Sequence, residues 1–511
     1  MAAAQTGVVP VGRMAYCAAL KTPSEVPLAH VRFYGRLLFL GCGSVTQCTL
    51  PLVLDSISLE PSQVTVFDMV DNRHRIAGPL ALGVHYVQGQ ITPDNLHNTL
   101  SGLVGEGDIC LDLAWNIDCE TMLEWCRDHG VRYLNTSVEV WDPYEDSAQV
   151  HPIHRTLYVR HMAMRRMFAR WGDNKGPSAV VEHGANPGLV SHLTKEALGQ
   201  IATRALHDGL LGNRVAAVET ALAHGSYNSL AHALDVKVIH VAERDTQITS
   251  VPKRVNEFVN TWSVDGLYEE GVAPAELGWG THERFMPLGA FQHAGNGPGN
   301  QIALAEMGCK VKVRSLVPSG EIVGMVIRHG EAFTISDHLT VWDDGQAVYR
   351  PTVHYAYCPA DVAIASMHEL EMRQFVMQPE KRILNDEIDS GIDELGVLLM
   401  GHPYKSWWNG SLLSIDQARA LVPGQSATTV QVGSSVLGAV VWMIRHPSEG
   451  VRVPDELPWE EVLDVARPYW GPLWSGAIDW DPLQNRFDIF GRYAQRNQDL
   501  ADPWQFINFL V

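Results

Sequence analysis

Two glycines at the end of an apolar run have the spacing of a phosphate-binding turn. The run Leu37-Leu-Phe-Leu40 leads directly into Gly41-Cys42-Gly43-Ser44-Val45-Thr46. Gly41 would permit the tight turn, and Gly43 would let the backbone approach a pyrophosphate that faces the amides of Ser44 and Val45. The sixth position of this G-x-G-x-x-G pattern is Thr46, so the pattern taken alone also fits a plain tight turn.

Asp68 follows the next apolar run, 64–67, at the distance expected for a carboxylate that binds a ribose hydroxyl. Because a carboxylate there disfavours a 2′-phosphate, the pair of features predicts NAD as the cofactor, although Arg73 and Arg75 lie nearby. We assign Ala114 and Thr136, which follow two further apolar runs, to the same cofactor site.

The turn Gly184-Ala-Asn-Pro-Gly188 follows another apolar run, 179–181. The carboxyl end of a parallel sheet is where a nicotinamide would lie, so Asn186 is a candidate for both cofactor and substrate contact. The plain alternative is a turn at a domain boundary. Glu139 lies at an equivalent level of the predicted sheet, as does Thr136, and is a candidate substrate contact.

Four acid-bearing segments with nearby aromatic residues lie between residues 240 and 396, in the predicted second domain. Each has an ordinary explanation: Glu243 in a surface ion pair, Trp262 in the core, Asp393 in a helix cap. Together they suit a diamine, because carboxylates bind terminal ammonium ions, a Trp face attracts a cation and an apolar wall accepts methylenes. The segments are residues 240–247, 260–266, 269–270 and 391–396.

The elements that would position these groups are parallel strands with crossover helices. Short apolar runs alternate with amphipathic stretches, which predicts strands buried on both faces. Asp118 can cap a helix that stops at Gly130, whereas Pro51 predicts a kinked or late-starting helix after the glycine turn. The predicted strands are residues 37–40, 64–67, 84–87, 109–113, 133–136 and 179–181.

The predicted fold class is α/β: a Rossmann-type, doubly wound parallel sheet with a second α+β domain for substrate binding and dimerisation. Residues 1–35 are assigned to an N-terminal extension, 36–186 to the NAD-binding domain and 187–411 to the substrate domain. Helices within 412–450, predicted at 414–421 and 434–446, would complete the first domain. Residues 451–511 form a C-terminal segment.

Composition narrows the class of protein. With 46% hydrophobic and 19% charged residues in 511, the chain is predicted to be globular, and no apolar stretch or leader predicts a membrane span or export. Eight cysteines without a CxxC pair predict no metal site and no disulfide framework. A net charge of −20 disfavours nucleic acid and anionic membranes and would attract cations. We expect a cytoplasmic enzyme.

Several long strings resemble the bacterial homospermidine synthase family, within the saccharopine dehydrogenase-like group. The resemblance covers the chain from about residue 36 to the end, apart from residues 141–170 and Thr46. It implies NAD-dependent aminobutyl transfer from putrescine or spermidine to putrescine, with NAD as a retained, redox-neutral prosthetic group, in a homodimer. The strings are HVAERDTQ (240–247), FVNTWSV (258–264), PAELGWGTHERFMP (274–287), VYRPTVHYAYCP (348–359), GIDELGVLL (391–399), DPWQF (502–506) and GANPG (184–188).

The resemblance also implies roles for single residues. Trp262 would hold cationic intermediates, Glu243 and Glu270 would bind or deprotonate amino groups, and Asp393 would anchor a distal ammonium. Asn186 would set the nicotinamide geometry, and His329 would shuttle protons, although a structural role fits a lone histidine equally well. Asn116 stands where the family has an acid, so Asp118 is a substitute candidate for that outer contact.

Two other functions fit parts of the pattern. A saccharopine or carboxyspermidine-type NAD(P)-dependent dehydrogenase would need a cationic clamp for a substrate carboxylate, whereas these segments are rich in acids and aromatics. A non-catalytic protein that binds polyamines or NAD would share the fold without the chemistry. Product analysis separates all three.

Overall fold

The computed structural model describes residues 31–145, 149–293, 297–486, 489–490 and 498–511. The predicted N-terminal extension lies outside the described residues except for residues 31–35. These five include β1 (Val31–Arg32), which pairs in parallel with β3 (Ile57–Ser58). Val31 and Phe33 alternate inward and are buried, so this part of the predicted extension belongs to the first core.

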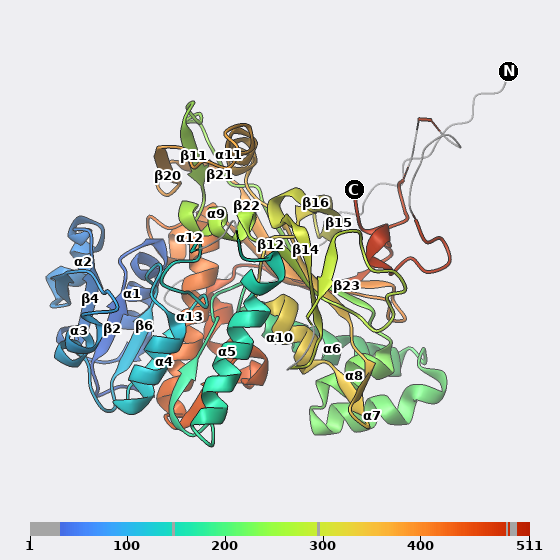
Figure 1. Ribbon diagram of the computed structural model, residues 1–511, viewed down its shortest axis with the longest axis horizontal. Helices are drawn as coiled ribbons and strands as arrows, with labels where there is room; N and C mark the ends of the chain where they lie inside the picture. Colours follow the sequence, from blue (N-terminus) through green and yellow to red (C-terminus); the bar gives the residue numbers. More distant parts are fainter. Residues whose placement is uncertain (1–30, 146–148, 294–296, 487–488, 491–497) are drawn as a thin grey trace.

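The first sheet has seven strands, all parallel, and its order confirms the predicted Rossmann-type fold (Figure 1). β2 is central, with β4 on one side and β6 on the other, so the strand order reverses direction beside the glycine turn. All six predicted strands are present. In spatial order the strands are β24 (Glu449–Arg452), β8 (Gly176–Val180), β7 (Arg132–Asn135), β6 (Ile109–Asp112), β2 (Leu37–Leu40), β4 (Val64–Asp68) and β5 (His85–Gln88).

Crossover helices connect these strands, and two of them test details of the sequence prediction. α1 begins at Ser44, directly after the glycine turn, so a later start was wrong; Pro51 lies inside the helix. The side chain of Asp118 accepts the amide of Thr121 and caps α4, as predicted. The helices are α1 (Ser44–Ser56), α2 (Ala77–Leu82), α3 (Leu96–Leu103), α4 (Cys119–Asp128) and α5 (Leu157–Arg170).

The second sheet has ten strands and is mostly antiparallel. Its centre is β9, which pairs in parallel with β19 and antiparallel with β22. The main path runs β13 (Ala290–Gln292), β14 (Gln301–Met307), β12 (Pro274–Gly278), β19 (Thr352–Cys358), β9 (Val238–Asp245), β22 (Ile392–Met400), β23 (Ser406–Ser414) and β25 (Leu473–Ile478). Off this path, β16 (Gly320–Met325) pairs with β19, and β15 (Lys312–Val317) pairs with β16.

Helices and small ribbons surround this sheet. α6 follows the turn at Gly184 to Gly188 and packs on β22 and β23. The helices are α6 (Leu189–His207), α7 (Val215–His224), α8 (Tyr227–Leu234), α9 (Val264–Val272), α10 (Glu331–His338) and α11 (Asp361–Met372). The ribbons pair β10 (Ile248–Thr249) with β21 (Ile388–Ser390), β11 (Glu257–Asn260) with β20 (Glu380–Ile383), and β17 (Val341–Asp343) with β18 (Gln346–Tyr349).

The C-terminal part of the chain joins both sheets. α12 (Ile415–Leu421) and α13 (Ala427–Arg445) confirm the two predicted helices, although α13 begins before Ser434. α13 packs against α1 and lies between the two sheets in Figure 1. The predicted C-terminal segment then divides: β24 pairs with β8, and β25 pairs with β23. α14 (Trp459–Ala466) follows β24 and precedes β25 in the sequence, and it packs on α13.

Length and composition alone would let α13 cross a membrane, and among the described residues it is the single such helix. However, 89% of its apolar window is buried inside the protein. The helix is apolar because it forms the shared core of the two sheets.

Candidate functional site

The glycine turn lies where the carboxyl ends of β2, β4 and β6 meet. Gly41 has φ +87°, and a Cβ there would lie 2.8 Å from the carbonyl oxygen of Leu113 and 3.0 Å from the Cα of Ala114. Glycine is therefore required for β2 to turn against the end of β6. Ala114 borders this turn.

Gly43 fits the backbone approach that a pyrophosphate needs. It has ordinary dihedral angles (φ −74°, ψ −172°), and a Cβ there would meet nothing within 4 Å. No side chain caps α1 and no acid lies in its first turn. The amides of Ser44 and Val45 thus stand at an uncapped helix N-terminus, which attracts an anion. The residues present fit a dinucleotide.

Asp68 is held beside this turn by two backbone amides. One carboxylate oxygen accepts the amide of Cys42 at 2.5 Å and the other accepts the amide of Val70 at 2.7 Å. Arg73 is engaged by Asp71 at 2.6 Å, so its guanidinium is not free for a 2′-phosphate. This arrangement favours a ribose hydroxyl as the partner of Asp68.

The second half of the site is one face of the second sheet. Residues paired across neighbouring strands point to the same face, and the register pairs Glu243 with Tyr357 and Asp245 with Asp393. The three carboxyl groups are all buried, with 2% or less of each residue exposed. The sequence explanations of Glu243 as a surface ion pair and Asp393 as a helix cap were therefore wrong.

Glu243 is joined to the turn that follows β8. The amide nitrogen of Asn186 donates to Glu243 Oε2 at 2.6 Å and also to the hydroxyl of Tyr355, and that hydroxyl donates to the same oxygen. Burial raises the pKa of Glu243 to about 8, although these hydrogen bonds oppose the shift. Asn186 thus brings the edge of the first sheet to the acidic face of the second.

Trp262 borders this acidic face and is only partly buried. Its indole nitrogen donates to the hydroxyl of Tyr357 at 2.9 Å, and the Tyr355 and Tyr357 rings stack with centroids 5.2 Å apart. An aromatic wall therefore lies beside the buried carboxyl groups. Aromatic faces next to carboxylates are the surroundings that alkylammonium ions prefer.

Asp393 has one oxygen without a protein partner. Its Oδ2 accepts the hydroxyl of Thr428 at 2.5 Å, whereas its buried Oδ1 accepts no hydrogen bond. Burial and the nearby carboxyl groups of Glu243 and Asp245 raise the pKa of Asp393. A buried acceptor of this kind normally has a partner, and a ligand ammonium would supply it.

A second group of acids lies on α9 and after β7. Glu139 Oε2, Glu269 Oε2 and Glu270 Oε2 are buried and accept no hydrogen bond from the protein. Glu269 Oε1 binds the guanidinium groups of Arg328 at 2.6 Å and Arg160 at 3.5 Å. Burial raises the pKa of both Glu139 and Glu270. A cavity of about 370 Å³ opens beside them, lined by Glu269, Arg160 and Arg328 among others.

His329 lies between two carboxyl groups. Its Nε2 is 3.5 Å from Glu270 Oε2, and its Nδ1 is 3.4 Å from Glu331 Oε2. Burial, followed by the charge of Arg328, lowers the pKa of His329 to about 3, so the imidazole is neutral near pH 7. The ring also meets the edge of Tyr355 with centroids 4.4 Å apart.

Two candidate residues lie at the edge of the first sheet. Thr136 lies next to the Gly184 turn, since a Cβ on Gly184 would be 3.7 Å from it. Asn116 adopts φ 58° and has a buried Oδ1 without a partner. Asp118 uses its carboxylate to bind the amide and hydroxyl of Thr121, which argues against its use as a substitute substrate acid.

Sequence reasoning missed three polar residues of the acidic face, Tyr355, Tyr357 and Thr428, and gave no role to Asp245, which lies in the segment 240–247. The two tyrosines alternate in the string VYRPTVHYAYCP, and this alternation was the available signal. Thr428 begins a helix far along the chain, and no local pattern connects it to Asp393. Among the described residues, no group of three or more His, Cys, Asp or Glu could hold a metal ion.

Two known domain families match consecutive parts of the chain. Residues 37–180 match the saccharopine dehydrogenase NADP binding domain, and residues 184–478 match the saccharopine dehydrogenase C-terminal domain. The first match spans the strands around the glycine turn. The second begins at the turn that carries Asn186.

Similar proteins cover nearly the whole chain. The homospermidine synthase of Blastochloris viridis is 39% identical over 494 residues, which are 96% of this chain and 99% of that protein. The homospermidine synthase of Mesorhizobium japonicum is 38% identical over 93% of this chain and 96% of that protein. The structure of a homospermidine synthase from Legionella pneumophila in complex with NAD has a TM-score of 0.81 and 36% identity, covering 94% of this chain and 99% of that one. With its glycine turn and acidic aromatic face, the chain belongs to the homospermidine synthase family.

Proposed function

We propose that the protein is a homospermidine synthase: it transfers the aminobutyl group of putrescine, or of spermidine, to putrescine and gives homospermidine; with putrescine as donor, ammonia is released. The observation that carries this proposal is the contact of Asn186 with Glu243. It joins a dinucleotide-binding edge to a face of buried acids and aromatic rings. Such a face suits a substrate with two ammonium ends and no negative charge.

The proposed cofactor is NAD. Bound at the Gly41 to Val45 turn, NAD would accept a hydride from the donor carbon and return it later, so that no net oxidation occurs. The first family match is named for NADP, but Asp68 beside the turn and the engagement of Arg73 by Asp71 support NAD. We further propose that the first sheet with α13 forms the NAD-binding domain and the second sheet the substrate domain.

The reaction requires groups that store protons. Both amines enter as ammonium ions, and each must lose a proton, one before hydride loss and one before attack on the imine carbon. The new secondary amine and the released ammonia take two protons back. Glu243, whose pKa is raised to about 8, and Glu270, whose pKa is also raised, suit this exchange near neutral pH.

The remaining residues would hold the substrate. Asp393, with its free buried oxygen, would bind the distal ammonium of the donor, and Trp262 would stabilise the iminium carbon through its ring face. Glu139, Glu270 and Asn116 would bind the acceptor amine. Exclusion of water by the enclosed face would protect the imine from hydrolysis to an aldehyde.

The chief alternative is a dehydrogenase for an amino-acid-derived imine, which needs a cation for the substrate carboxylate. Arg328 and Arg160 lie beside the acids on α9, and both bind Glu269. An arginine already engaged by a carboxylate is a poor clamp for a second one. The geometry therefore gives no support to this alternative.

Deuterium tracing tests the proposal. The protein, with a catalytic amount of NAD, is incubated with putrescine carrying two deuterium atoms on each terminal carbon, and products are analysed by mass spectrometry. We expect homospermidine and ammonia in equal amounts, full retention of deuterium at the carbons of the new bond, and no accumulation of NADH. Stoichiometric NADH, or a requirement for an α-amino acid, would favour the dehydrogenase. Putrescine binding without turnover would indicate a non-catalytic protein.

We also propose a cytoplasmic homodimer. The resemblance to the family supports the dimer, and the seven described cysteines, all free and buried, are compatible with a reducing compartment. Light scattering on the purified protein measures the oligomeric state.

A further inference from the structure

Glu182 has an unusual backbone conformation, and the proposed reaction assigns this residue no role. It begins the segment Glu182 to Gly188, which links β8 to α6 and carries Asn186. Its φ is 59°, in the left-handed region that side-chain-bearing residues rarely adopt, and only 2% of the residue is exposed. A charged residue in a costly conformation inside the protein indicates a function that offsets the cost.

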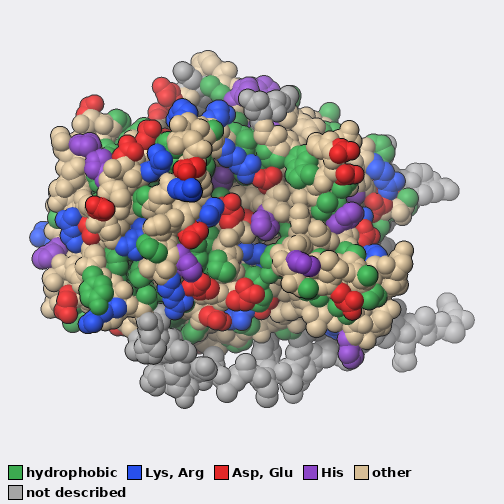
Figure 2. All heavy atoms as spheres, turned by 90° about the horizontal axis from the view of Figure 1, so that it is seen from below, with side chains coloured by type: hydrophobic (Ala, Val, Ile, Leu, Met, Phe, Trp, Pro, Cys, Tyr) green, Lys and Arg blue, Asp and Glu red, His purple; other side chains and the backbone are tan. Residues whose placement is uncertain are grey.

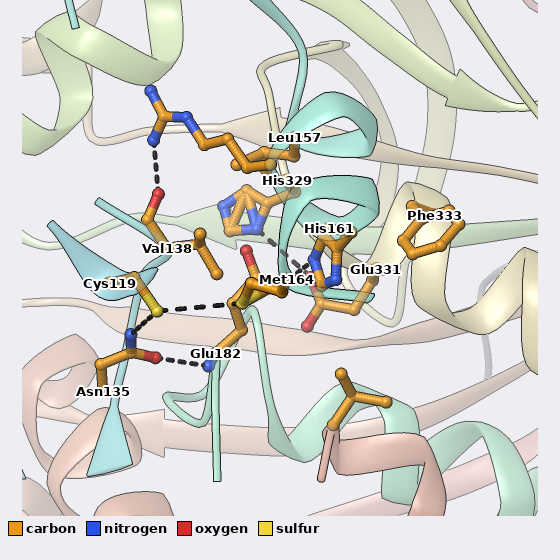
Figure 3. Close-up of polar contacts among 12 residues, drawn as sticks. Cys119, Asn135, Val138, Leu157, His161, Met164, Glu182, His329, Glu331 and Phe333 are labelled. Atoms are coloured by element: carbon orange, nitrogen blue, oxygen red, sulfur yellow. Dashed lines mark hydrogen bonds and ion pairs between the residues drawn. The ribbon is translucent and has the colours of Figure 1, made fainter. Parts of the chain in front are cut away.

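The contacts of Glu182 hold it firmly at the edge of the first sheet. Its Oε2 binds Nε2 of His161, on α5, at 2.8 Å (Figure 3). Its backbone amide donates to Oδ1 of Asn135, the last residue of β7, at 2.8 Å, and the Asn135 amide donates to Cys119 Sγ. Both ends of Glu182 are thus fixed by buried partners.

The same carboxylate packs against the turn that carries His329. A Cβ added to Gly330 would lie 2.0 Å from Glu182 Oε2, so the carboxylate lies directly on the Gly330 backbone. In return, Glu331 Oε1 accepts the amide of Gly188 at 2.7 Å. The two segments therefore interlock at two points. Figure 3 shows the His161–Glu182 pair beside the His329–Glu331 pair.

We propose that Glu182 is a positioning residue that, with His161, fixes the Gly330 turn and thereby orients the His329 imidazole between Glu331 and Glu270. This inference rests on the proposed function, in which Glu270 exchanges protons, and on the proton-shuttle role that the family resemblance implies for His329. Glu182 would act through the Gly330 turn and not directly on substrate or cofactor.

The charge of Glu182 also determines which nitrogen of His329 holds the proton. Burial, followed by the charge of Glu182, raises the pKa of Glu331, which favours the protonated form of this carboxyl. Since Oε1 accepts the Gly188 amide, the Oε2 hydroxyl of Glu331 faces Nδ1 of His329. The imidazole proton then lies on Nε2, directed toward Glu270.

The other groups that face this imidazole come from three elements. Arg328 precedes it in the chain and binds Glu269, Tyr355 on β19 meets the ring edge, and Glu270 on α9 faces Nε2. Glu243 accepts the Tyr355 hydroxyl behind the ring. These groups remain in a Glu182 variant, so a change in the titration of His329 and Glu331 reports on Glu182.

The test is Glu182→Gln, which keeps the shape and an oxygen acceptor for His161 but removes the charge. We expect kcat to fall about tenfold, a part of the usual contribution of proton transfer, with KM for putrescine and NAD changed less than about twofold. The limb of the kcat–pH profile set by the His329–Glu331 pair is expected to move to lower pH, because Glu331 loses a raising charge. Nitrogen-15 NMR of the free protein is expected to show that His329 has lost its uniform Nε2–H state.

The matched control is Glu283→Gln. Glu283 is another glutamate with a buried side chain and two protein donors, the hydroxyl of Thr352 and the amide of Phe506. It is expected to leave kcat, the pH profile and the His329 signal unchanged. A double variant with Glu331→Gln is expected to be no slower than Glu331→Gln alone, because Glu182 acts through Glu331.

An unmoved pH profile and NMR signal in Glu182→Gln would overturn the proposal, as would independent, multiplying effects of Glu182 and Glu331. If Glu182→Gln does not fold, Gly330→Ala decides. Gly330 has φ −62°, which alanine tolerates, but the new methyl group would displace the Glu182 carboxylate. Unchanged kcat in Gly330→Ala would then refute the role. The NMR measurement needs no turnover, so it separates failure of this inference from failure of the proposed function.

Discussion

At the scale of single residues, the candidate site is marked by buried carboxyl oxygens that accept no hydrogen bond. Asp393 Oδ1, Glu139 Oε2 and Glu270 Oε2 accept no hydrogen bond, although unpaired buried oxygens are rare in folded proteins. The cost of burying these groups is offset when a cationic ligand enters. This reasoning gives two residue-level predictions, one for a carboxyl group and one for an aromatic ring.

Glu243 makes the stability of the free protein depend on pH. Between pH 4.5 and about 8 the unfolded chain ionises this carboxyl while the folded protein retains its proton, so the free energy of unfolding falls as pH rises. Glu243→Gln removes this titration. Relative to wild type, the variant is therefore expected to gain stability between pH 5 and pH 8, by on the order of a few kcal/mol. Thermal unfolding at several pH values measures the difference, and a pH-independent difference would contradict the raised pKa.

Trp262 provides the residue-level test of cation binding by an aromatic face. Trp262→Phe keeps a ring but loses the hydrogen bond to Tyr357, so it is expected to retain part of the wild-type kcat/KM for putrescine. Trp262→Leu keeps an apolar side chain without a ring and is expected to lose most of the activity, since a desolvated cation–π contact contributes up to about 2 kcal/mol. Equal activity of Leu and Phe variants would show that the ring face has no role.

At the scale of elements, the β2–α1 turn separates a folding requirement from a binding requirement. Gly41 is needed by the fold, because of its positive φ and the nearby Leu113 carbonyl. Gly43 is free of both constraints. The two glycines of one motif thus serve different purposes, and substitution distinguishes them.

Gly43→Ala is expected to leave the melting temperature of the NAD-free protein unchanged and to weaken NAD binding about tenfold or more, because the methyl group occupies space that the pyrophosphate needs. Gly41→Ala is expected to lower stability by about 1–3 kcal/mol even without NAD. Thermal unfolding and titration calorimetry on both variants measure these effects. Normal NAD affinity in a folded Gly43→Ala protein would place the pyrophosphate elsewhere.

At the scale of the whole molecule, charge and topology both matter. The chain carries a net charge of −20. On the face shown in Figure 2, acidic and basic side chains lie interspersed, so this face carries no large field of one sign. The long-range effect of the negative charge on a cationic substrate is therefore expected to be moderate, and salt should screen it.

Raising ionic strength from about 0.02 M to 0.5 M is expected to increase KM for putrescine several-fold, because the Debye length falls below about 5 Å. KM for NAD, an anion, is expected to stay constant or to fall, which makes it the internal control. Steady-state kinetics at fixed pH measures both constants. Parallel increases in the two constants would point to a general effect of salt on the protein.

The topology of the whole chain brings the site together. α13 packs on α1 of the first sheet and supplies Thr428 to Asp393 in the second. Asn186 and Glu331 make the reciprocal connections across the same boundary. The two sheets therefore meet through specific polar contacts at the site as well as through a shared apolar core.

The sequence by itself determined the first sheet and its cofactor turn. The periodicity of apolar residues and the spacing of glycines are local properties of a sequence. Short segments therefore predicted all six strands, the α4 cap at Asp118 and the positions of Gly41, Gly43 and Asp68. The acids and Trp262 could be selected for their chemistry. For α1, Pro51 predicted either a kink or a late start. The helix begins at Ser44, so the late start was wrong.

Only the tertiary structure decided which acids are buried, which oxygens lack partners and which residues assist them. Tyr355, Thr428, Glu331 and Glu182 reach the site from separate elements, and no local pattern encodes their contacts, whose partners lie 35 to 143 residues apart in the chain. Burial sets the pKa of Glu243, and burial is a property of the packed whole. The residue types in the sequence indicated the chemistry. The geometry of the site depends on how the two sheets pack around α13.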